Sequence, residues 1–226
     1  MLEALLGRVD RSLYAKSGRI FYSGRSAFSR PNDLYILGLN PGGSPEKQQD
    51  ETIERDIEEA LIRPSDWSAY QDEGWLGKSP GRHGMQPRVQ HLLGKLGRDP
   101  RSVPASNVVF VRTSRESGLE GQKQDLLDVC WPVHEATINE LGIKTILCFG
   151  GTAGSWVRER MGAHAGPVDK FEEQNARRWT SYAHLAPDGR CVITLTHPSI
   201  AKWDAQSTDP TPLVERMLHR QERPWT

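Results

Sequence analysis

Residues 34–43 read Leu34-Tyr35-Ile36-Leu37-Gly38-Leu39-Asn40-Pro41-Gly42-Gly43, an apolar run that passes directly into a Gly/Pro turn carrying one amide side chain. The run predicts a buried strand that ends at the turn. Where such a turn precedes a helix, the last side chains of the strand lie at the carboxyl edge of a parallel sheet, where open α/β folds bind ligands. We therefore expect Asn40 to face a cleft. The alternative is an Asx turn, in which Asn40 only satisfies its own backbone.

The strand, turn and helix pattern recurs along the chain. Further apolar runs lie at Val108 to Val111, Thr145 to Phe149 and Val192 to Leu195, and residues 122–141 and 153–161 have helical spacing. This alternation predicts an α/β fold with a parallel sheet covered by helices. Three strand ends would then bring Asn40, residues 112–114 and His197 to one edge.

The remaining segments are less regular. Met1 to Leu13 has helical spacing, and Ser44-Pro45-Glu46 predicts the start of a charged, solvent-facing helix that reaches Ile62. Residues 63–84 are rich in Trp, Gly and Pro and predict a loop that forms a lid or pocket wall. Residues 162–189 are polar and poorly periodic. We expect one domain over residues 1–226, with a core at about 19–202 and a helix at each end.

Composition narrows the classes of function. The chain has 29 Lys and Arg against 29 Asp and Glu, so contact with a polyanion requires a local basic cluster. The cysteines Cys130, Cys148 and Cys191 form no CxxC pair and are expected to be buried, reduced thiols. No leader segment or run of membrane-spanning length is visible. We expect an intracellular, cytoplasmic protein that is a monomer.

Four motifs occur in a characteristic order. They are Gly38-Leu39-Asn40-Pro41-Gly42, Asn107-Val108-Val109, Ile146-Leu147-Cys148-Phe149-Gly150 with Thr152-Ala153, and His197-Pro198-Ser199. This ordered set resembles the uracil-DNA glycosylase superfamily. The first motif is similar to the mismatch-specific and single-strand-selective branches, whereas residues 19–24 and 74–77 resemble the iron–sulfur branch. That branch uses four cysteine ligands, and this chain has three cysteines, none in its N-terminal third.

The resemblance implies a three-layer α/β/α fold around a central, mainly parallel four-stranded sheet. It also implies a monofunctional DNA glycosylase of base excision repair, which flips a deaminated base, with uracil expected, and hydrolyses its N-glycosidic bond. The expected partner is single- or double-stranded DNA carrying a damaged base, which would place the protein at the nucleoid when bound. No metal, cofactor or iron–sulfur cluster is expected.

Two residues are the expected catalytic pair. The Asn40 amide cannot take a proton near neutral pH, so the resemblance implies that it positions a water rather than acting as a general base. His197 is expected to donate a hydrogen bond to the carbonyl oxygen of the leaving pyrimidine, where negative charge grows. A histidine at a strand end can also be merely exposed or hydrogen-bonded.

The resemblance extends to substrate contacts. Asn107 is expected to meet the Watson–Crick edge of the base, and Trp75, with Trp67 and Tyr70 behind it, to stack on it. The base-binding set is Gly38, Leu39, Pro41, Gly42, Trp75 and Asn107. The DNA-binding set is Arg112, Ser114, Pro198, Ser199, Ile200 and Lys202, with Ile200 as the minor-groove wedge. The alternatives are a strand cap for Asn107, core packing for Trp75 and a solvated charged face.

Two other functions remain open. Asn40 in place of a carboxylate and the neutral net charge would also suit a catalytically weak or inactive nucleobase- or DNA-binding member of the superfamily. Hydrolysis of free nucleosides or nucleotides would account for the absence of a net positive charge. The sequence does not indicate which base is excised or which strand form is preferred.

Overall fold

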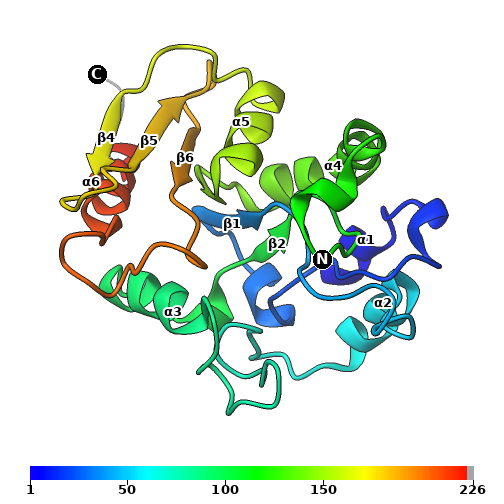
Figure 1. Cartoon of the computed structure of the whole chain (residues 1–226). Coiled ribbons are helices and arrows are strands. Elements are labelled where there is room, and N and C mark those ends of the chain that lie inside the picture. Colours follow the sequence, from blue (N-terminus) through cyan, green and yellow to red (C-terminus); the bar gives the residue numbers. More distant parts are fainter. Residues whose placement is uncertain (223–226) are drawn as a thin grey trace.

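The strand predicted at Leu34 lies inside a six-stranded mixed sheet in the computed structural model of the chain, which describes residues 1–222 (Figure 1). The strands are β1 (Leu34–Gly38), β2 (Ala105–Asn107), β3 (Thr145–Phe149), β4 (Asp169–Glu172), β5 (Thr180–Leu185) and β6 (Cys191–Leu195). Their order is β2-β1-β3-β6-β5-β4, with β2, β1, β3 and β6 parallel and β5 and β4 antiparallel. Residues 223–226 of the predicted domain lie outside the described residues.

The helices connect these strands. They are α1 (Leu2–Leu6), α2 (Ile53–Ile62), α3 (Gln86–Lys95), α4 (Lys123–Leu141), α5 (Gly151–Arg160) and α6 (Thr211–Glu222). Short 3₁₀ helices span Arg11–Leu13, Arg25–Phe28, Pro100–Ser102 and Glu116–Leu119. The end of α4 is set by Gly142, whose φ of 69° is the left-handed conformation that glycine adopts without steric cost.

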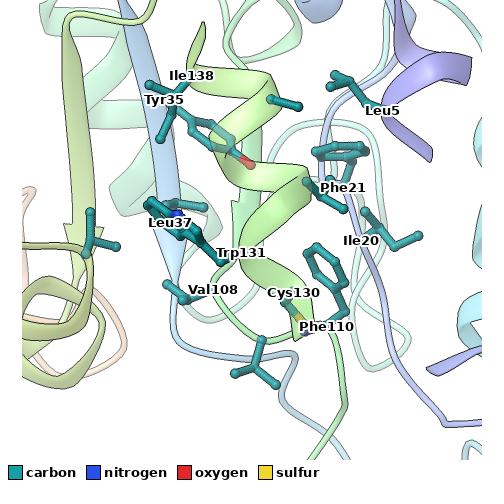
Figure 2. Packing of buried hydrophobic residues seen from close by; sticks show 14 of the residues in the cluster. Leu5, Ile20, Phe21, Tyr35, Leu37, Val108, Phe110, Cys130, Trp131 and Ile138 are labelled. Carbon is teal, nitrogen blue, oxygen red and sulfur yellow. The ribbon is translucent and has the colours of Figure 1, made fainter. Parts of the chain in front are cut away.

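Both faces of the sheet are covered, because the side chains of each strand alternate between two apolar clusters. Tyr35 and Leu37 of β1 belong to the cluster that includes residues of α1, α4 and α5, part of which Figure 2 shows. Leu34 and Ile36 belong to the cluster that includes residues of α3 and α6. Strands buried on both faces lack polar alternation, which explains why β1 is a continuous apolar run. The α/β prediction is confirmed.

The prediction of a four-stranded sheet is not confirmed, because β4 and β5 add two antiparallel strands at one edge. Both lie in residues 162–189, where edge strands with an exposed face have few apolar residues to reveal them. The strand expected at Val108 to Val111 is also displaced. β2 ends at Asn107, and the valines after it are buried in irregular backbone.

Two helix predictions need correction. The helix expected from Ser44 begins at Ile53 as α2, where the Thr52 hydroxyl accepts the Arg55 N–H at 3.2 Å. Ser44 instead hydrogen-bonds Glu46, its Oγ lying 2.7 Å from the carboxylate Oε2. Residues 1–13 form α1 and a separate 3₁₀ turn rather than one helix.

The three cysteines are buried, free thiols, as predicted. Burial raises the pKa of Cys130 and of Cys191 to about 12, and it raises the pKa of Cys148 as well. Among the described residues, no helix has the length and apolar character needed to cross a membrane.

Candidate active site

The carboxyl ends of the four parallel strands open into one cleft of about 1390 Å³. Most of the predicted site residues line it, namely Gly38, Leu39, Asn40, Gly42, Trp75, Asn107, Arg112, Ser114, His197, Ser199 and Ile200. Pro41, Pro198 and Lys202 are not part of its lining. Parallel topology explains the convergence, because strands that run the same way place their last residues at the same edge.

Asn40 is held by its amide nitrogen. Nδ2 donates to Thr113 Oγ1 at 2.7 Å and also lies within 3.3 Å of the Val111 and Pro41 carbonyl oxygens. Three acceptors around one atom identify it as the nitrogen. Within residues 1–222 no donor contacts Oδ1 of Asn40, so the Asx turn is not formed. The arrangement leaves the amide oxygen as the group that Asn40 can present to a bound molecule.

His197 is held in one tautomer. The Ser199 N–H donates to its Nδ1 at 3.1 Å, and Ser199 Oγ lies 2.7 Å from the same atom. Since Nδ1 accepts the backbone proton, the neutral ring carries its own proton on Nε2. Burial lowers the pKa of His197 and so favours the neutral ring. Gly150, at φ 93°, lies against this ring, where an added Cβ would come within 3.4 Å of Cδ2.

Asn107 is the last residue of β2 and pairs in register with Gly38 of β1. Its side chain lies over the Gly38 backbone, where a Cβ would come within 2.1 Å of Asn107 Oδ1. Tyr22 lines the same part of the cleft. Burial raises the pKa of Tyr22, and the Arg19 charge and the Asn107 side chain oppose that rise. Gly38 is therefore required for the position of Asn107.

Trp75 belongs to an aromatic wall. Its ring meets Tyr70 edge-on, with centroids 6.1 Å apart, and Tyr70 stacks on Tyr22 at 5.9 Å. All three rings line the cleft. Tyr70 lies behind Trp75 as predicted, whereas Trp67 is outside the cleft lining, under the Arg63 guanidinium at 4.3 Å. The wall gives the cleft the flat apolar surface that a planar ligand requires.

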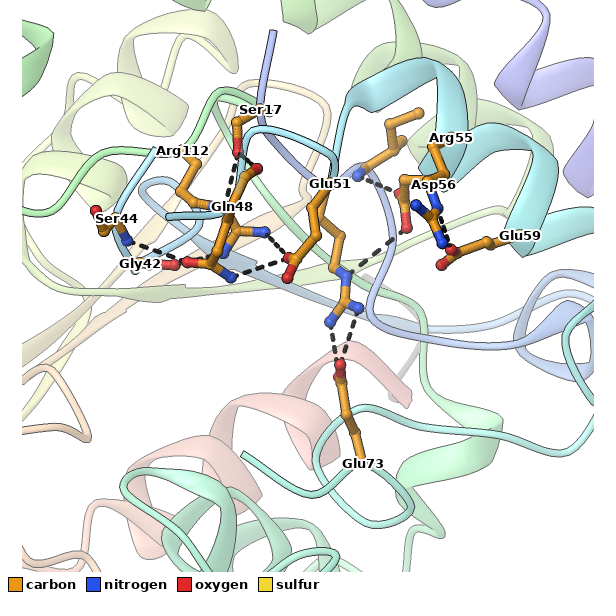
Figure 3. Close-up of polar contacts among 12 residues, drawn as sticks. Ser17, Gly42, Ser44, Gln48, Glu51, Arg55, Asp56, Glu59, Glu73 and Arg112 are labelled. Carbon is orange, nitrogen blue, oxygen red and sulfur yellow. Dashed lines mark hydrogen bonds and ion pairs between the residues drawn. The ribbon is translucent and has the colours of Figure 1, made fainter. Parts of the chain in front are cut away.

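Arg112 braces the Asn40 turn from inside the protein (Figure 3). Its guanidinium donates to the Gly42 carbonyl at 2.7 Å, to Glu51 at 2.7 Å and to Ser17 Oγ at 3.1 Å. Gln48 completes the brace, because its Oε1 accepts the Ser44 N–H at 3.0 Å. With three protein partners and a side chain that is only 9% exposed, Arg112 holds the turn, and this geometry does not support the expected DNA contact.

A second ionic network adjoins the aromatic wall. Arg19 makes two parallel hydrogen bonds to Glu73, at 2.7 and 2.9 Å, and its Nε lies 3.7 Å from Asp56 (Figure 3). Asp56 also accepts the Ile20 N–H at 2.8 Å. The Arg19 cation lies 5.2 Å from the centroid of Tyr22. The network fixes Tyr22 and ties the residue 63–84 loop to the first core segment.

The rim of the cleft is partly apolar. Leu76 is 85% exposed and Ile200 is 54% exposed, and both line the opening. Leu76 has a φ of 49°, an unfavourable conformation for a residue with a branched side chain. Ser114, Ser199 and Lys202 are exposed. Pro198 is buried, and its carbonyl accepts from Arg88, which ties α3 to the loop after β6.

Several residues of this site had no signal in the sequence. Thr113 was expected to lie at the same sheet edge as Asn40, and its hydroxyl anchors the Asn40 amide. Gln48 and Glu51 lie in a charged segment without an assigned role, and Arg19 and Glu73 are 54 residues apart. The described residues hold no group of three His, Cys, Asp or Glu side chains that could bind a metal. Searches of protein-family models and of curated proteins found no match to this chain.

Proposed function

We propose that this chain is a monofunctional DNA glycosylase that hydrolyses the N-glycosidic bond of a flipped, deaminated base, with uracil as the expected substrate. One observation carries the proposal. Asn40 and His197 are each held by protein contacts at one polar atom, which leaves Asn40 Oδ1 and His197 Nε2–H for the ligand at the same edge of the sheet.

The chemistry follows from what each group can do. Asn40 Oδ1 accepts a hydrogen bond from a water and aims its oxygen at C1′ of the deoxyribose. The C1′–N bond breaks and its electron pair leaves with the base, while the water oxygen forms the new bond to C1′. The neutral His197 donates from Nε2 to the base oxygen on which negative charge grows. The proton lost by the water passes to solvent or to the departing base.

The rest of the cleft suits base recognition. The side chain of Asn107 carries a donor and an acceptor, and Trp75 offers a stacking face. The exposed Ile200 and Leu76 are candidate wedges for the space that a flipped base leaves. The family expectation of a uracil-DNA glycosylase-like fold, acting in base excision repair at the nucleoid, is part of this proposal.

A second candidate is a nucleobase-binding protein with little or no catalysis. It is favoured by the pairing of two carboxylates that line the cleft. Glu73 is paired with Arg19 and Glu51 with Arg112, so neither is available as a general base. Hydrolysis of free nucleosides is the third candidate, and the exposed apolar rim argues for a polymeric substrate instead.

The test is base release from labelled oligonucleotides that carry uracil, hypoxanthine or xanthine, single-stranded and mispaired, without added metal. We expect release by the wild type. Both Asn40→Ala and His197→Ala should lower its rate by about 100- to 1000-fold, the usual effect of removing a group that stabilises developing charge. His219→Ala, on the exposed side of α6, is the matched control and should release base at the wild-type rate.

Binding separates the candidates. Retained binding by His197→Ala with lost release supports the glycosylase. Binding by the wild type without release from any lesion would replace the glycosylase with the nucleobase-binding protein. If wild-type release from a free nucleoside is faster than from DNA and duplex DNA does not compete, the nucleoside hydrolase replaces it.

A further inference from the structure

Beyond His197 the cleft continues into a part that the proposed chemistry does not use, named here the α5–β5 lobe. Its residues are Ser155 and Arg158 of α5, Tyr182 and His184 of β5, Thr194 of β6, and Thr196 directly after β6. The register places Tyr182 opposite Thr194 and His184 opposite Val192, so these side chains share the face on which α5 packs. The wall formed by β5 exists because of the antiparallel extension of the sheet.

Three buried polar atoms of the lobe have no hydrogen-bond partner within the part of the chain that the structure describes. They are His184 Nδ1, Thr194 Oγ1 and Thr196 Oγ1. His184 is 5% exposed, so solvent does not compensate it. A buried polar group without a partner is unfavourable, and three that line one lobe indicate a ligand that supplies the missing partners. Each can act as a hydrogen-bond donor.

The lobe also carries uncompensated positive charge. Arg158 is half-buried, its Nε lies 3.3 Å from the Ala163 carbonyl, and no carboxylate among the described side chains, those of residues 1–221, is paired with it. The pKa of His184 is lowered mainly by burial, and the nearby charge of Arg158 lowers it further. Lys170 of β4 lies opposite Tyr182, outside the cleft lining, and has no ion pair among the described residues. The nearby Glu172 is neutralised by Arg178 at 2.6 Å.

The lobe connects to the loop that holds His197. Arg177 packs on Trp179, with its Cζ 4.2 Å from the ring centroid, and donates to the Ile200 carbonyl at 3.1 Å. Trp179 is 37% exposed and lines the cleft. A nucleic-acid strand whose flipped base contacts His197 would therefore pass along this side of the opening.

We propose that the α5–β5 lobe binds a phosphate group of the strand that carries the flipped nucleotide, with Arg158 supplying the charge and His184, Thr194 and Thr196 the hydrogen bonds. Hydrogen-bond donors around a guanidinium, with no carboxylate in the lobe lining, match the oxygens of a phosphodiester. The strand part of this proposal rests on the proposed function.

The first experiment replaces one phosphodiester at a time with a neutral methylphosphonate. The probe is a labelled oligonucleotide that carries 2′-fluorodeoxyuridine, which resists cleavage, and the readout is Kd by fluorescence anisotropy. We expect one replacement near the uridine to weaken wild-type binding about tenfold, as loss of a charge-assisted contact does. In Arg158→Gln the same replacement should have almost no further effect. Arg160→Gln is the matched control, since Arg160 lies on α5 but pairs with Asp128 and stacks on Trp156.

The second experiment tests the anion site without DNA. Thermal unfolding is compared in inorganic phosphate and in chloride of equal ionic strength. Phosphate should raise Tm for the wild type and Arg160→Gln but not for Arg158→Gln. The same Tm shift in all three proteins overturns the site.

The outcomes separate the two proposals. Phosphate binding that depends on Arg158, with no position-specific effect of methylphosphonates, overturns the assignment to the DNA strand. A position-specific effect without base release from any lesion supports the lobe and rejects the glycosylase. If the protein releases base but Arg158→Gln changes neither the methylphosphonate effect on Kd nor the phosphate effect on Tm, the phosphate site is rejected and the glycosylase proposal stands.

Discussion

The two halves of the sheet differ in burial and in what they bring to the cleft. All five residues of β1 and of β3 are buried, and the ends of these parallel strands lead to Asn40 and Gly150. β4 has no buried residue and three of the six residues of β5 are buried, and this antiparallel half supplies the wall of the α5–β5 lobe that carries His184, whereas Thr194 and Thr196 come from β6 and the residue after it. In the two proposals above, the parallel half would position the reacting groups and β5 would form one wall of the phosphate site.

Among changes to the scaffold of the two halves, the largest expected effect comes from Gly38→Ala, which acts at the centre of the parallel half. A Cβ there would come within 2.1 Å of Asn107 Oδ1 and displace it. A misplacement of about 1 Å can cost about 100-fold in rate, and we expect a loss of base release of that size. Gly94→Ala is the matched control, because Gly94 lies on α3 outside the cleft lining and its Cβ would meet nothing within 4 Å. Equal activity of the two variants would contradict the role given to Gly38.

Gly154→Ala tests whether the halves depend on each other, because α5 packs on β6 where they meet. The added Cβ would come within 2.0 Å of Thr194 Oγ1, and overpacking of this kind costs about 3 kcal/mol. Urea unfolding measures the loss. Gly151→Ala, on the same helix with open space around its Cβ, should differ little from the wild type. A loss below 1 kcal/mol for Gly154→Ala would show that α5 moves freely relative to β6.

Part of the pH dependence of stability should come from His134, which contacts β1 of the parallel half. Its Nδ1 lies 2.9 Å from Tyr35 Oη of β1, and burial lowers its pKa from 6.5 to about 4. The unfolded chain then binds the proton more tightly, so the free energy of unfolding falls as pH drops from 6.5 toward 4. The loss is about 2 kcal/mol by pH 5.

His134→Gln should remove that part of the pH dependence in urea unfolding between pH 7 and 5. His219→Gln, a change at an exposed position of α6, should retain it. His184 and His197 also have pKa values lowered by burial, so some dependence should persist in His134→Gln. Parallel curves for His134→Gln and the wild type would argue against a neutral, buried His134.

The smallest effect is expected at the antiparallel edge. Arg216 of α6 makes two hydrogen bonds to Asp169 of β4, at 2.8 and 3.1 Å, but it is 52% exposed. Exposed ion pairs contribute little, so Arg216→Ala should cost about 0.5 kcal/mol in global stability. Amide exchange in β4 should nevertheless become faster than in β1. Uniform acceleration of exchange over the whole sheet would contradict the independence of this edge.

Sequence patterns predict the strands of the parallel half much better than those of the antiparallel half. The runs at Leu34 and Thr145 were predicted at their first residue, since strands buried on both faces leave uninterrupted apolar stretches. β5 reads Thr-Ser-Tyr-Ala-His-Leu, in which burial comes from packing against β6 rather than from apolar side chains. β2 was misplaced because the valines after it are as buried as a strand.

The sequence likewise predicts only one part of the candidate site, the residues at the strand ends. Asn40, Asn107 and His197 follow from motif order, because parallel strand ends must converge. What holds them does not follow from local sequence. The Thr113 contact to Asn40, the Arg112 brace on Gly42 and the Arg19–Glu73 pair join segments that only the folded chain brings together.

The rates at which the three buried thiols are alkylated would report which half of the sheet opens. Cys148 and Cys191 lie on β3 and β6, Cys130 lies on α4, and none lies on β4 or β5. An alkylating reagent reacts with thiolate, which burial suppresses at all three positions, so modification must await a local opening of the fold. Detachment of the antiparallel edge would leave Cys130 and Cys148 protected but would uncover Cys191, which pairs with Leu185 of β5, so faster labelling of Cys191 than of Cys148 would record the opening of that edge alone.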